Sequence, residues 1–417
     1  MARAERDRDV VRQLAEQVAE IAALPVHGQT VESWGRLNDL QPVKPLVWIN
    51  EMPWHETEGD EELAVTSEDP FCRAVETDLR RVIYQWRHMP GDMVVEGKLY
   101  APLVIRDSGF GISEDVDIVM TDARSDVVSR DFHPQIDNES DLDKIKFPEI
   151  SHDAAASQRD YEQLQALVGD ILPVEQRGVV GTWFAPWDEL VRWWDVEKVL
   201  LDLVLRPELV HQAMDRLVNA CLQRLDQWEE LGLLSLNNTN VRIGSGGLGY
   251  TDELPQPDFD ASHVRPVDMW GFATAQIFGA VSPEMHWEFA LQYEKRWLDR
   301  FGLTYYGCCE PLHDKLEMLK ANIPNLRKIS MSPWVDVDKA VGQVGADYIF
   351  SYKPNPAIFA DEDWHPDRVR RELRETLAKT RGCVVEVIMK DISTVRYQPQ
   401  RLWDWAQIAR EETERVV

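Results

Sequence analysis

Residues 303–352 contain the runs LTYYGCC (303–309), LRKISM (326–331) and DYIFSY (347–352), separated by segments long enough for one helix each. Short apolar runs that alternate with helical segments predict parallel strands joined by crossover helices. The pattern extends in both directions along the chain. Five further candidate strands are Pro45–Glu51, Met93–Val95, Arg177–Trp183, Leu233–Asn237 and Cys383–Met389.

Eight strands over this length favour an α/β fold of the (β/α)8 TIM-barrel type above an open sheet. We expect residues 45–417 to form the barrel catalytic domain and residues 1–44 to form an N-terminal helical extension. The first ~40 residues are predicted as one amphipathic helix, because apolar side chains recur at helical spacing. The segments Glu56–Asp69 and Asp107–Pro148 fit the alternation badly and are predicted as loops or insertions.

The segment after residue 281 predicts the clearest helix. Ser282 supplies an N-cap, Pro283 occupies the first turn, and Glu284 places an acid near the positive helix end. The apolar residues that follow repeat every four positions and should face the barrel: Met285, Phe289, Tyr293 and Trp297.

The charge of the chain limits its partners. Lys and Arg total 45 and Asp and Glu 73, which leaves a formal net charge of −28 that repels nucleic acid and anionic lipid. Five cysteines make an odd, sparse set, which indicates a reducing compartment, and we expect the cytoplasm. The chain shows neither a signal peptide nor an apolar segment of ~18 residues that could span a membrane.

In a (β/α)8 barrel the active site lies at the carboxyl ends of the strands. Polar and aromatic residues near those ends are therefore the candidates, although Asn and Asp also cap helices and Trp also fills cores. The predicted catalytic residues are Cys308, Cys309, Glu310, Lys390, Asp391 and Glu51. The predicted substrate-binding residues are Trp48, Trp183, Asn237, Asn238, Ser245, Tyr250, Trp334 and Lys353.

One strand end combines thiols, a carboxylate and an imidazole. Cys308, Cys309, Glu310 and His313 are of the types that bind zinc, which could polarise an oxygen or bind a thiol. Adjacent residues on a strand point to opposite faces, so only one thiol should face the barrel unless the strand ends between them. The other interpretation is that one cysteine is a small buried apolar residue and the second merely its neighbour.

The run Gly244–Gly249 matches the dinucleotide motif G-x-G-x-x-G. Pro255 and Pro257 follow it closely and prevent the helix whose N-terminus would hold a pyrophosphate. We therefore reject nucleotide binding and expect a flexible glycine loop at the catalytic mouth.

After residue 45 the chain resembles the uroporphyrinogen decarboxylase superfamily. The likeness lies in the first strand at Pro45–Ile49, the turn Gly181–Trp187, and the helix from Ser282 to Tyr293. The decarboxylases follow their first strand with an arginine-rich clamp for carboxylates. Here Asn50–Glu56 is acidic, which is the wrong charge for a porphyrinogen.

The other large branch contains methyltransferases that exchange methyl groups with a corrinoid protein and hold zinc with a His-x-Cys motif and a later cysteine. Cys308 matches the first cysteine, but Tyr306 stands at the histidine position. At the last strand, Cys383 lies at the beginning, and the carboxyl end presents Lys390 and Asp391. The resemblance therefore implies zinc in an altered site.

The strings Gly-Cys-Cys-Glu-Pro (307–311) and Lys-Pro-Asn-Pro (353–356) are similar to the anaerobic group that demethylates methoxylated aromatics and methylamines. The resemblance implies a methyltransferase that demethylates a small donor, with a methoxylated aromatic favoured and a methylamine possible. The chain lacks an Asp-x-His-x-x-Gly corrinoid motif, so a separate corrinoid protein is the implied partner. A homodimer is possible.

Two alternatives stay open. The first is a decarboxylase that acts on a less anionic substrate, with Glu51, Asp188 or Asp391 as the proton carrier. The second is a non-catalytic barrel that binds a small molecule.

Overall fold

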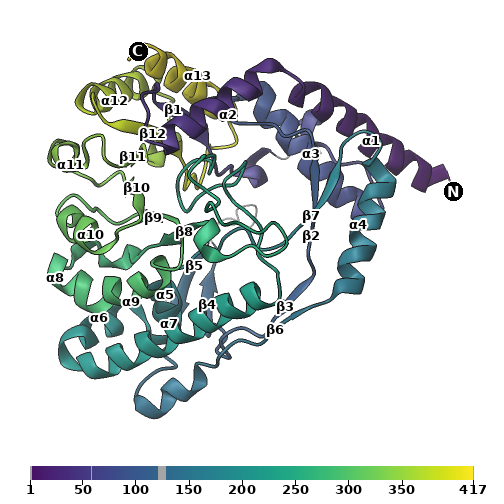
Figure 1. Ribbon diagram of the computed structural model, residues 1–417. Coiled ribbons are helices and arrows are strands. Elements are labelled where there is room, and N and C mark those ends of the chain that lie inside the picture. The colour runs from purple at the N-terminus through teal and green to yellow at the C-terminus, as the bar shows by residue number, and fades with distance from the viewer. Residues whose placement is uncertain (1, 58, 121–127, 417) are drawn as a thin grey trace.

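The computed structural model describes residues 2–57, 59–120 and 128–416, in which a six-stranded parallel sheet is the central element. Trp48 of the first strand lies opposite Ile388 of the last, and every neighbouring pair in this sheet is parallel. All six carboxyl ends therefore meet at one edge (Figure 1). In sheet order the strands are β1 (Leu46–Ile49), β12 (Val384–Met389), β11 (Ile349–Tyr352), β10 (Leu326–Met331), β9 (Leu303–Tyr306) and β8 (Trp270–Ala273).

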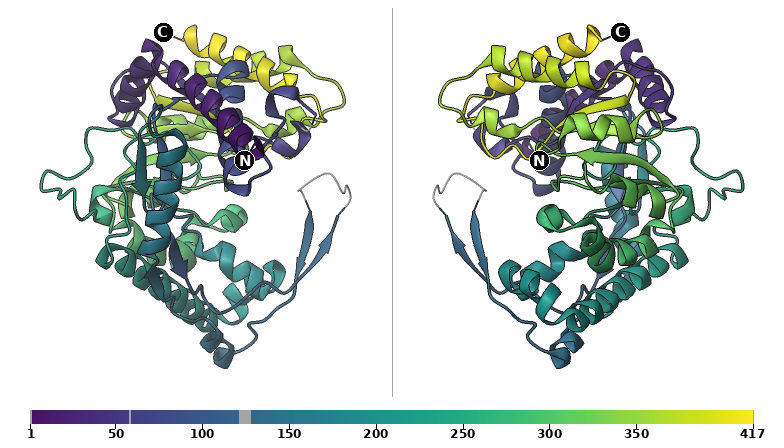
Figure 2. Two further views of the ribbon diagram at one scale, coloured as in Figure 1. Left: turned by 90° about the vertical axis from the view of Figure 1, so that its right-hand side faces the viewer. Right: turned by 90° about the vertical axis from the view of Figure 1, so that its left-hand side faces the viewer.

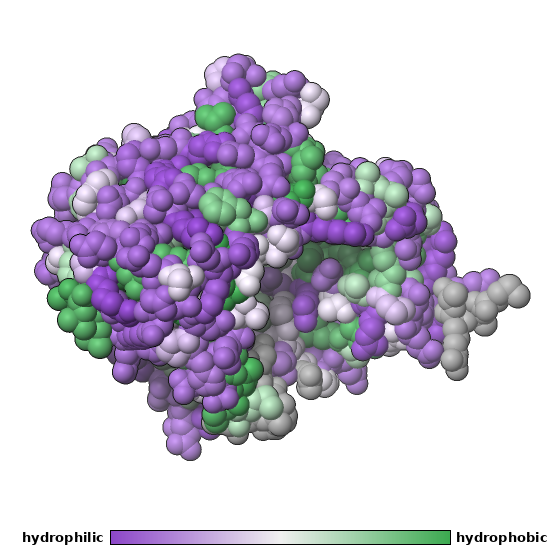
Figure 3. All heavy atoms as spheres, turned by 90° about the horizontal axis from the view of Figure 1, so that it is seen from below, coloured by the Kyte–Doolittle hydropathy of each residue, from purple (hydrophilic) through white to green (hydrophobic). Residues whose placement is uncertain are grey.

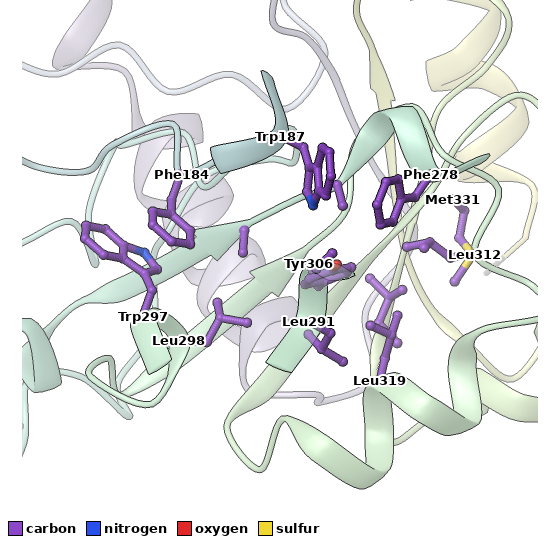
Figure 4. Packing of buried hydrophobic residues seen from close by; sticks show 14 of the residues in the cluster. Phe184, Trp187, Phe278, Leu291, Trp297, Leu298, Tyr306, Leu312, Leu319 and Met331 are labelled. Carbon is purple, nitrogen blue, oxygen red and sulfur yellow. The ribbon is translucent and has the colours of Figure 1, made fainter. Parts of the chain in front are cut away.

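Helices cover the outer face of this sheet, and the main apolar core lies between the two layers (Figure 1). Figure 4 shows Tyr306 of β9 at the centre of this core, with Trp187, Phe278 and Leu291 around it. The covering helices are α8 (Pro283–His286), α9 (Gln292–Leu298), α10 (Leu316–Asn322), α11 (Val337–Val344), α12 (Pro366–Lys379) and α13 (Gln400–Glu414).

A second group of elements faces the sheet across the centre of Figure 1. Strand β2 (Leu99–Pro102) pairs in parallel with β7 (Val174–Arg177), and one parallel bridge joins Val179 to Leu234. Within the described ranges, no strand pairing links β1 to β2. The described residues therefore form an α/β fold that contains a six-stranded parallel sheet and a separate pair of parallel strands, β2 and β7. Beside this strand pair lie α1 (Ala2–Ala22), α3 (Pro70–His88) and α4 (Ala154–Val168) (Figure 1). The helices α5 (Pro186–Trp194), α6 (Val196–Leu205) and α7 (Pro207–Glu230) lie next to α9, and α7 contacts it.

Five of the eight predicted strands form near their expected positions: β1, β9, β10, β11 and β12. Met93–Val95 is wrong as a strand, because it is an irregular segment in which the Val95 N–H donates to His27 Nδ1 at 3.3 Å. Beyond Arg177, which ends β7, the predicted strands Arg177–Trp183 and Leu233–Asn237 contribute only the single bridge between Val179 and Leu234. Strand β8 was missed, although it is a fully buried run that follows a short turn at Pro266–Asp268.

The predicted single N-terminal helix is two helices, because Pro25 begins the new helix α2 (Pro25–Asn38). The described parts of the segment Asp107–Pro148 contain regular elements where loops or insertions were predicted, and residues 121–127 lie outside the described ranges. The segment holds the antiparallel pair β4 (Val116–Val119) and β5 (Ser129–Phe132), which projects from the body in Figure 2, and a short turn helix, Glu139–Lys144.

Glu56–Asp69, predicted as a loop, contains short turns at Trp54–Thr57 and Glu61–Leu63. It is fixed to the segment after β12, because Glu56 accepts hydrogen bonds from the backbone N–H groups of Val395 and Tyr397 at 2.6 and 3.1 Å.

The predicted cap at Ser282 is confirmed, since its hydroxyl accepts the Met285 N–H at 3.2 Å. The helix is not regular, because Trp287–Leu291 forms one π-helical turn between α8 and α9. Such turns are rare and often occur at functional sites.

Polar side chains cover most of the face in Figure 3, and apolar side chains gather along a hollow in it. Across the described part of the chain, no helix combines the length and apolar character needed to cross a bilayer.

Candidate functional site

Two sulfur atoms, an ammonium group and a carboxylate meet at the carboxyl edge of the sheet. Lys390 Nζ lies 3.4 Å from Cys308 Sγ and 4.0 Å from Cys309 Sγ, and the two sulfurs are 3.4 Å apart. Asp391 accepts a hydrogen bond from Lys390, and its Oδ2 lies 3.6 Å from Cys309 Sγ. Four predicted catalytic residues therefore form one cluster, although β10 and β11 lie between β9 and β12 in the sheet.

The chain leaves strand β9 before it reaches the two thiols. The strand ends at Tyr306, and Gly307 has a φ of +96°, a conformation that favours glycine. A Cβ at this position would lie 2.6 Å from the Leu312 side chain. The alternation of side chains therefore stops at Gly307. As a result both sulfurs reach Lys390, whereas a continued strand would have directed only one of them inward.

Charges in the cluster favour a thiolate beside an ammonium. The hydrogen bond from Cys309 lowers the pKa of Cys308, and the positive charge of Lys390 lowers it further against the effect of burial. The same hydrogen bond, together with burial, raises the pKa of Cys309. Burial disfavours the Lys390 ammonium, but Cys308 and Asp391 more than offset it and raise the pKa of this lysine. Within the pair, the thiolate is therefore favoured at Cys308 over Cys309, beside a lysine whose charged form is also favoured.

Glu51, the fifth predicted catalytic residue, supports the cluster through the backbone. Its Oε2 accepts the Asp391 N–H at 3.0 Å, and its Oε1 accepts a hydrogen bond from Arg242 at 2.9 Å. Asp391 has a φ of +55°, which is unusual for a residue other than glycine. Glu51 and Arg242 therefore hold the turn that presents Lys390 and Asp391.

Glu310, the sixth predicted catalytic residue, lies behind the thiols, and its side chain is 1% exposed. Its oxygens accept the Thr274 hydroxyl at 2.9 and 3.1 Å and the Cys308 N–H at 2.9 Å. Burial raises the pKa of Glu310. This carboxyl group fixes the backbone that carries Cys308.

The four predicted zinc ligands do not come together. The carboxylate oxygens of Glu310 already accept hydrogen bonds from the Thr274 hydroxyl and the Cys308 N–H. His313 Nδ1 accepts the Asp336 N–H at 3.3 Å, and His313 Nε2 lies 3.3 Å from Asp314. The described residues contain no group of three or more His, Cys, Asp or Glu side chains arranged for a metal ion. Two sulfurs alone fall short of the four ligands of a structural zinc site and of the three of a catalytic one.

A buried polar network fills the concave side of the sheet below the cluster. Lys328 donates to Glu386 at 2.9 Å, and both side chains are completely buried. Burial opposes the ionisation of Glu386, but Lys328 and Lys353 together lower its pKa. Lys353, a predicted substrate-binding residue, is 2% exposed and donates to Tyr305 and Ser351, and burial lowers its pKa to about 7.

The Lys328–Glu386 pair was not predicted from the sequence. The sequence feature that could have revealed it is Glu386, a charged residue in the middle of the apolar run Val384–Met389. A charged residue buried in such a strand needs a counterion inside the protein.

The glycine run Gly244–Gly249 packs into the same concave face, so a flexible loop at the mouth is wrong. The Gly247 N–H donates to Glu386 at 3.2 Å, and a Cβ there would lie 2.3 Å from Trp34. Ser245 is fully buried and bonds to the Tyr305 hydroxyl at 3.0 Å and to the Gly307 carbonyl at 3.2 Å. The glycines allow close backbone packing, and Ser245 connects that segment to β9.

Two cavities lie near these groups. One of about 310 Å³ borders Cys309, and its wall also contains Asp188, Gln276 and Phe132. Asp188 accepts hydrogen bonds from Trp183 at 3.1 Å and Gln276 at 2.6 Å, and burial raises its pKa. A second cavity of about 450 Å³ is largely apolar and has Trp48 and Arg242 in its wall. Arg242 connects this second cavity to the cluster through Glu51.

Among the remaining predicted residues, Trp183 and Asn237 line one pocket of about 190 Å³. Asn237 is bonded to the backbone of Val180 and Trp270, and Asn238 donates to the Leu254 carbonyl at 2.7 Å. Both amides connect backbone segments. Tyr250 is half-buried, and burial raises its pKa. Trp183 and Trp334 are 43% and 67% exposed.

The comparisons with known proteins show a likeness of fold alone. No protein-family model matches the chain, and no curated protein matches it. Among solved structures, the chain is similar to a methyltransferase from Methanosarcina mazei, with a TM-score of 0.51 and 12% sequence identity over 92% of this chain and 98% of that one. At this identity, the likeness shows that the two chains share an α/β architecture over nearly their full lengths.

Proposed function

We propose that this protein is a methyltransferase that removes a methyl group from a small methylated donor, preferably a methoxylated aromatic, and passes it to a separate corrinoid protein. We further infer that the six-stranded sheet, the β2–β7 pair and the Val179–Leu234 bridge make up an interrupted barrel of the (β/α)8 type. The observation that carries the proposal is the cluster of Cys308, Cys309, Lys390 and Asp391 at the carboxyl edge of the sheet.

Demethylation of an aryl ether breaks the bond between the methyl carbon and the oxygen, and the electron pair stays on the oxygen as a phenolate. The corrinoid, when its protein is bound, supplies the nucleophile that takes the methyl group. Lys390 provides a fixed positive charge at the cluster, where an ammonium N–H can donate to the developing oxyanion. The raised pKa keeps this lysine charged, so we assign it to charge stabilisation, with the phenolate's proton taken up from solvent.

The donor site in this proposal is the 310 Å³ cavity beside Cys309. It is an open depression, and its volume lies at the lower end of the ~300–1,000 Å³ typical of small-molecule sites. Phe132 offers an aromatic face, and Asp188 holds the Trp183 indole and the Gln276 amide in position. Since the zinc ligands are not brought together, no step of the reaction is assigned to a metal.

The test is an assay of the purified protein with free reduced cobalamin and a panel of methoxyarenes and methylamines, in which the demethylated product is quantified by chromatography. We expect product from at least one donor and a loss of about 10²-fold or more in kcat for Lys390→Met. Lys379→Met is the matched control. Lys379, at the end of α12, pairs with Asp338 of α11 on the surface, so this substitution should leave the rate unchanged. No product from any donor with folded protein would contradict the proposal, and release of carbon dioxide from carboxylated donors would favour the decarboxylase alternative.

A further inference from the structure

Cys308 and Cys309 are adjacent in sequence, and their sulfurs are only 3.4 Å apart. We propose that they form a redox-active dithiol, which low-molecular-weight disulfides convert reversibly into a disulfide between the two neighbouring residues. The inference concerns the thiols alone and does not depend on methyl transfer. Its basis is the proximity of the sulfurs, the ammonium group that contacts both of them, and the cavity that borders one of them.

The two sulfurs differ in access. Cys309 is partly exposed and borders the 310 Å³ cavity, whereas Cys308 is 3% exposed and lies against Lys390. Cys309 is therefore the thiol that an oxidant meets first, and Cys308 is the thiol that completes the disulfide.

The reaction is a pair of thiol–disulfide exchanges. The Cys309 thiol gives its proton to solvent, its sulfur attacks one sulfur of the small disulfide, and one small thiolate leaves. That thiolate takes a proton from solvent and departs as a thiol. The Cys308 thiolate then attacks the Cys309 sulfur and expels the second small thiolate, which is protonated by solvent. Two cysteine thiols are oxidised, and one small disulfide is reduced to two small thiols.

The product should be easy to reduce. Consecutive Cα atoms are about 3.8 Å apart across a trans peptide, whereas ordinary disulfides join Cα atoms about 4.4–6.8 Å apart. A disulfide between neighbours is therefore strained, and strained disulfides are the labile ones. In a reducing compartment the pair should stay as thiols and close only when small disulfides accumulate. Closure would remove the thiolate beside Lys390 and leave that ammonium without its sulfur partner.

Mass spectrometry can test this directly, because the tryptic peptide Phe301–Lys315 contains both cysteines and no other. The intact protein is treated with oxidised glutathione, alkylated, digested and compared with protein treated in urea. We expect this peptide to lose two hydrogens, to resist alkylation and to recover with dithiothreitol. Closure should be about tenfold faster in the native protein than in urea, because the fold holds the two sulfurs 3.4 Å apart with the Lys390 ammonium beside them.

Two variants separate the roles. Cys308→Ser should keep glutathione attached at Cys309, and Lys390→Met should slow closure about tenfold. Equal rates in the native protein and in urea, or a glutathione adduct on the wild-type protein that never closes, would overturn the proposal. The urea comparison needs no variant, so a misfolded mutant cannot obscure the outcome.

Discussion

Lys390 is the residue on which the charge of the thiol pair depends. Lys390→Met removes the cation beside Cys308, so the apparent pKa of the pair should rise. The measurement is the pH dependence of iodoacetamide alkylation of peptide Phe301–Lys315. The alkylation profile should move to higher pH in Lys390→Met, move much less in Lys390→Arg, and stay in place in Lys379→Met. An unchanged profile in Lys390→Met would show that the lysine does not act on the sulfurs.

Glu294 is a fully buried acid that accepts a hydrogen bond from Tyr306. Tyr306 donates to it at 2.7 Å, His286 Nε2 lies 2.6 Å from the same hydroxyl, and burial raises the pKa of Glu294 from 4.5 to about 8. Between these two values the folded chain binds more protons than the unfolded chain, so this group's contribution to stability is lost as pH rises.

Glu294→Gln should remove that pH dependence. Urea unfolding at pH 5 and pH 8 should show the wild type losing up to roughly 3–4 kcal/mol more than the variant over this interval. Parallel losses in the two proteins would mean that Glu294 ionises as freely in the folded state as in the unfolded one.

At the scale of elements, the glycine segment 244–249 joins α2 to the sheet. Gly247→Ala would place a Cβ 2.3 Å from Trp34 and 2.9 Å from Glu386, so urea unfolding should show a loss of about 1–3 kcal/mol. Gly342→Ala in α11 is the control, because its Cβ meets nothing within 4 Å and alanine favours a helix by up to about 1 kcal/mol. A Gly247→Ala variant as stable as wild type would show that the segment moves away from the sheet at little cost.

At the scale of the whole molecule, the fold directs His313 away from the thiols. Protein incubated with zinc and then dialysed should therefore retain well below one zinc per chain by elemental analysis, because two sulfurs do not complete a site. Cys308→Ala should leave the zinc content unchanged. One zinc per chain that is lost in Cys308→Ala would restore the zinc site implied by the family resemblance.

The sequence by itself determined the elements whose signals are local. The runs of β1, β9, β10, β11 and β12 appear as strands because continuous apolar stretches bounded by turn residues suit a buried parallel sheet. The rule that strand ends carry the chemistry also selected Cys308, Cys309, Lys390 and Asp391, which the structure brings within hydrogen-bonding distance. The local sequence pattern was sufficient to predict these strands and their carboxyl ends, because both depend on residues that are neighbours along the chain.

Only the tertiary structure decided which of these groups act together. Lys328 and Glu386 are 58 residues apart, and Glu51 and Asp391 are 340 residues apart, so their pairing depends on how the sheet curves. The orientation of both thiols depends on the turn at Gly307, and that of His313 on its contact with Asp336. The residue types at this strand end, two thiols, a carboxylate and an imidazole, therefore predicted a metal site. In the folded chain, the two thiols lie beside the ammonium group of Lys390. The physical reason is that ligand geometry is set by distances through space, which residue order alone does not contain.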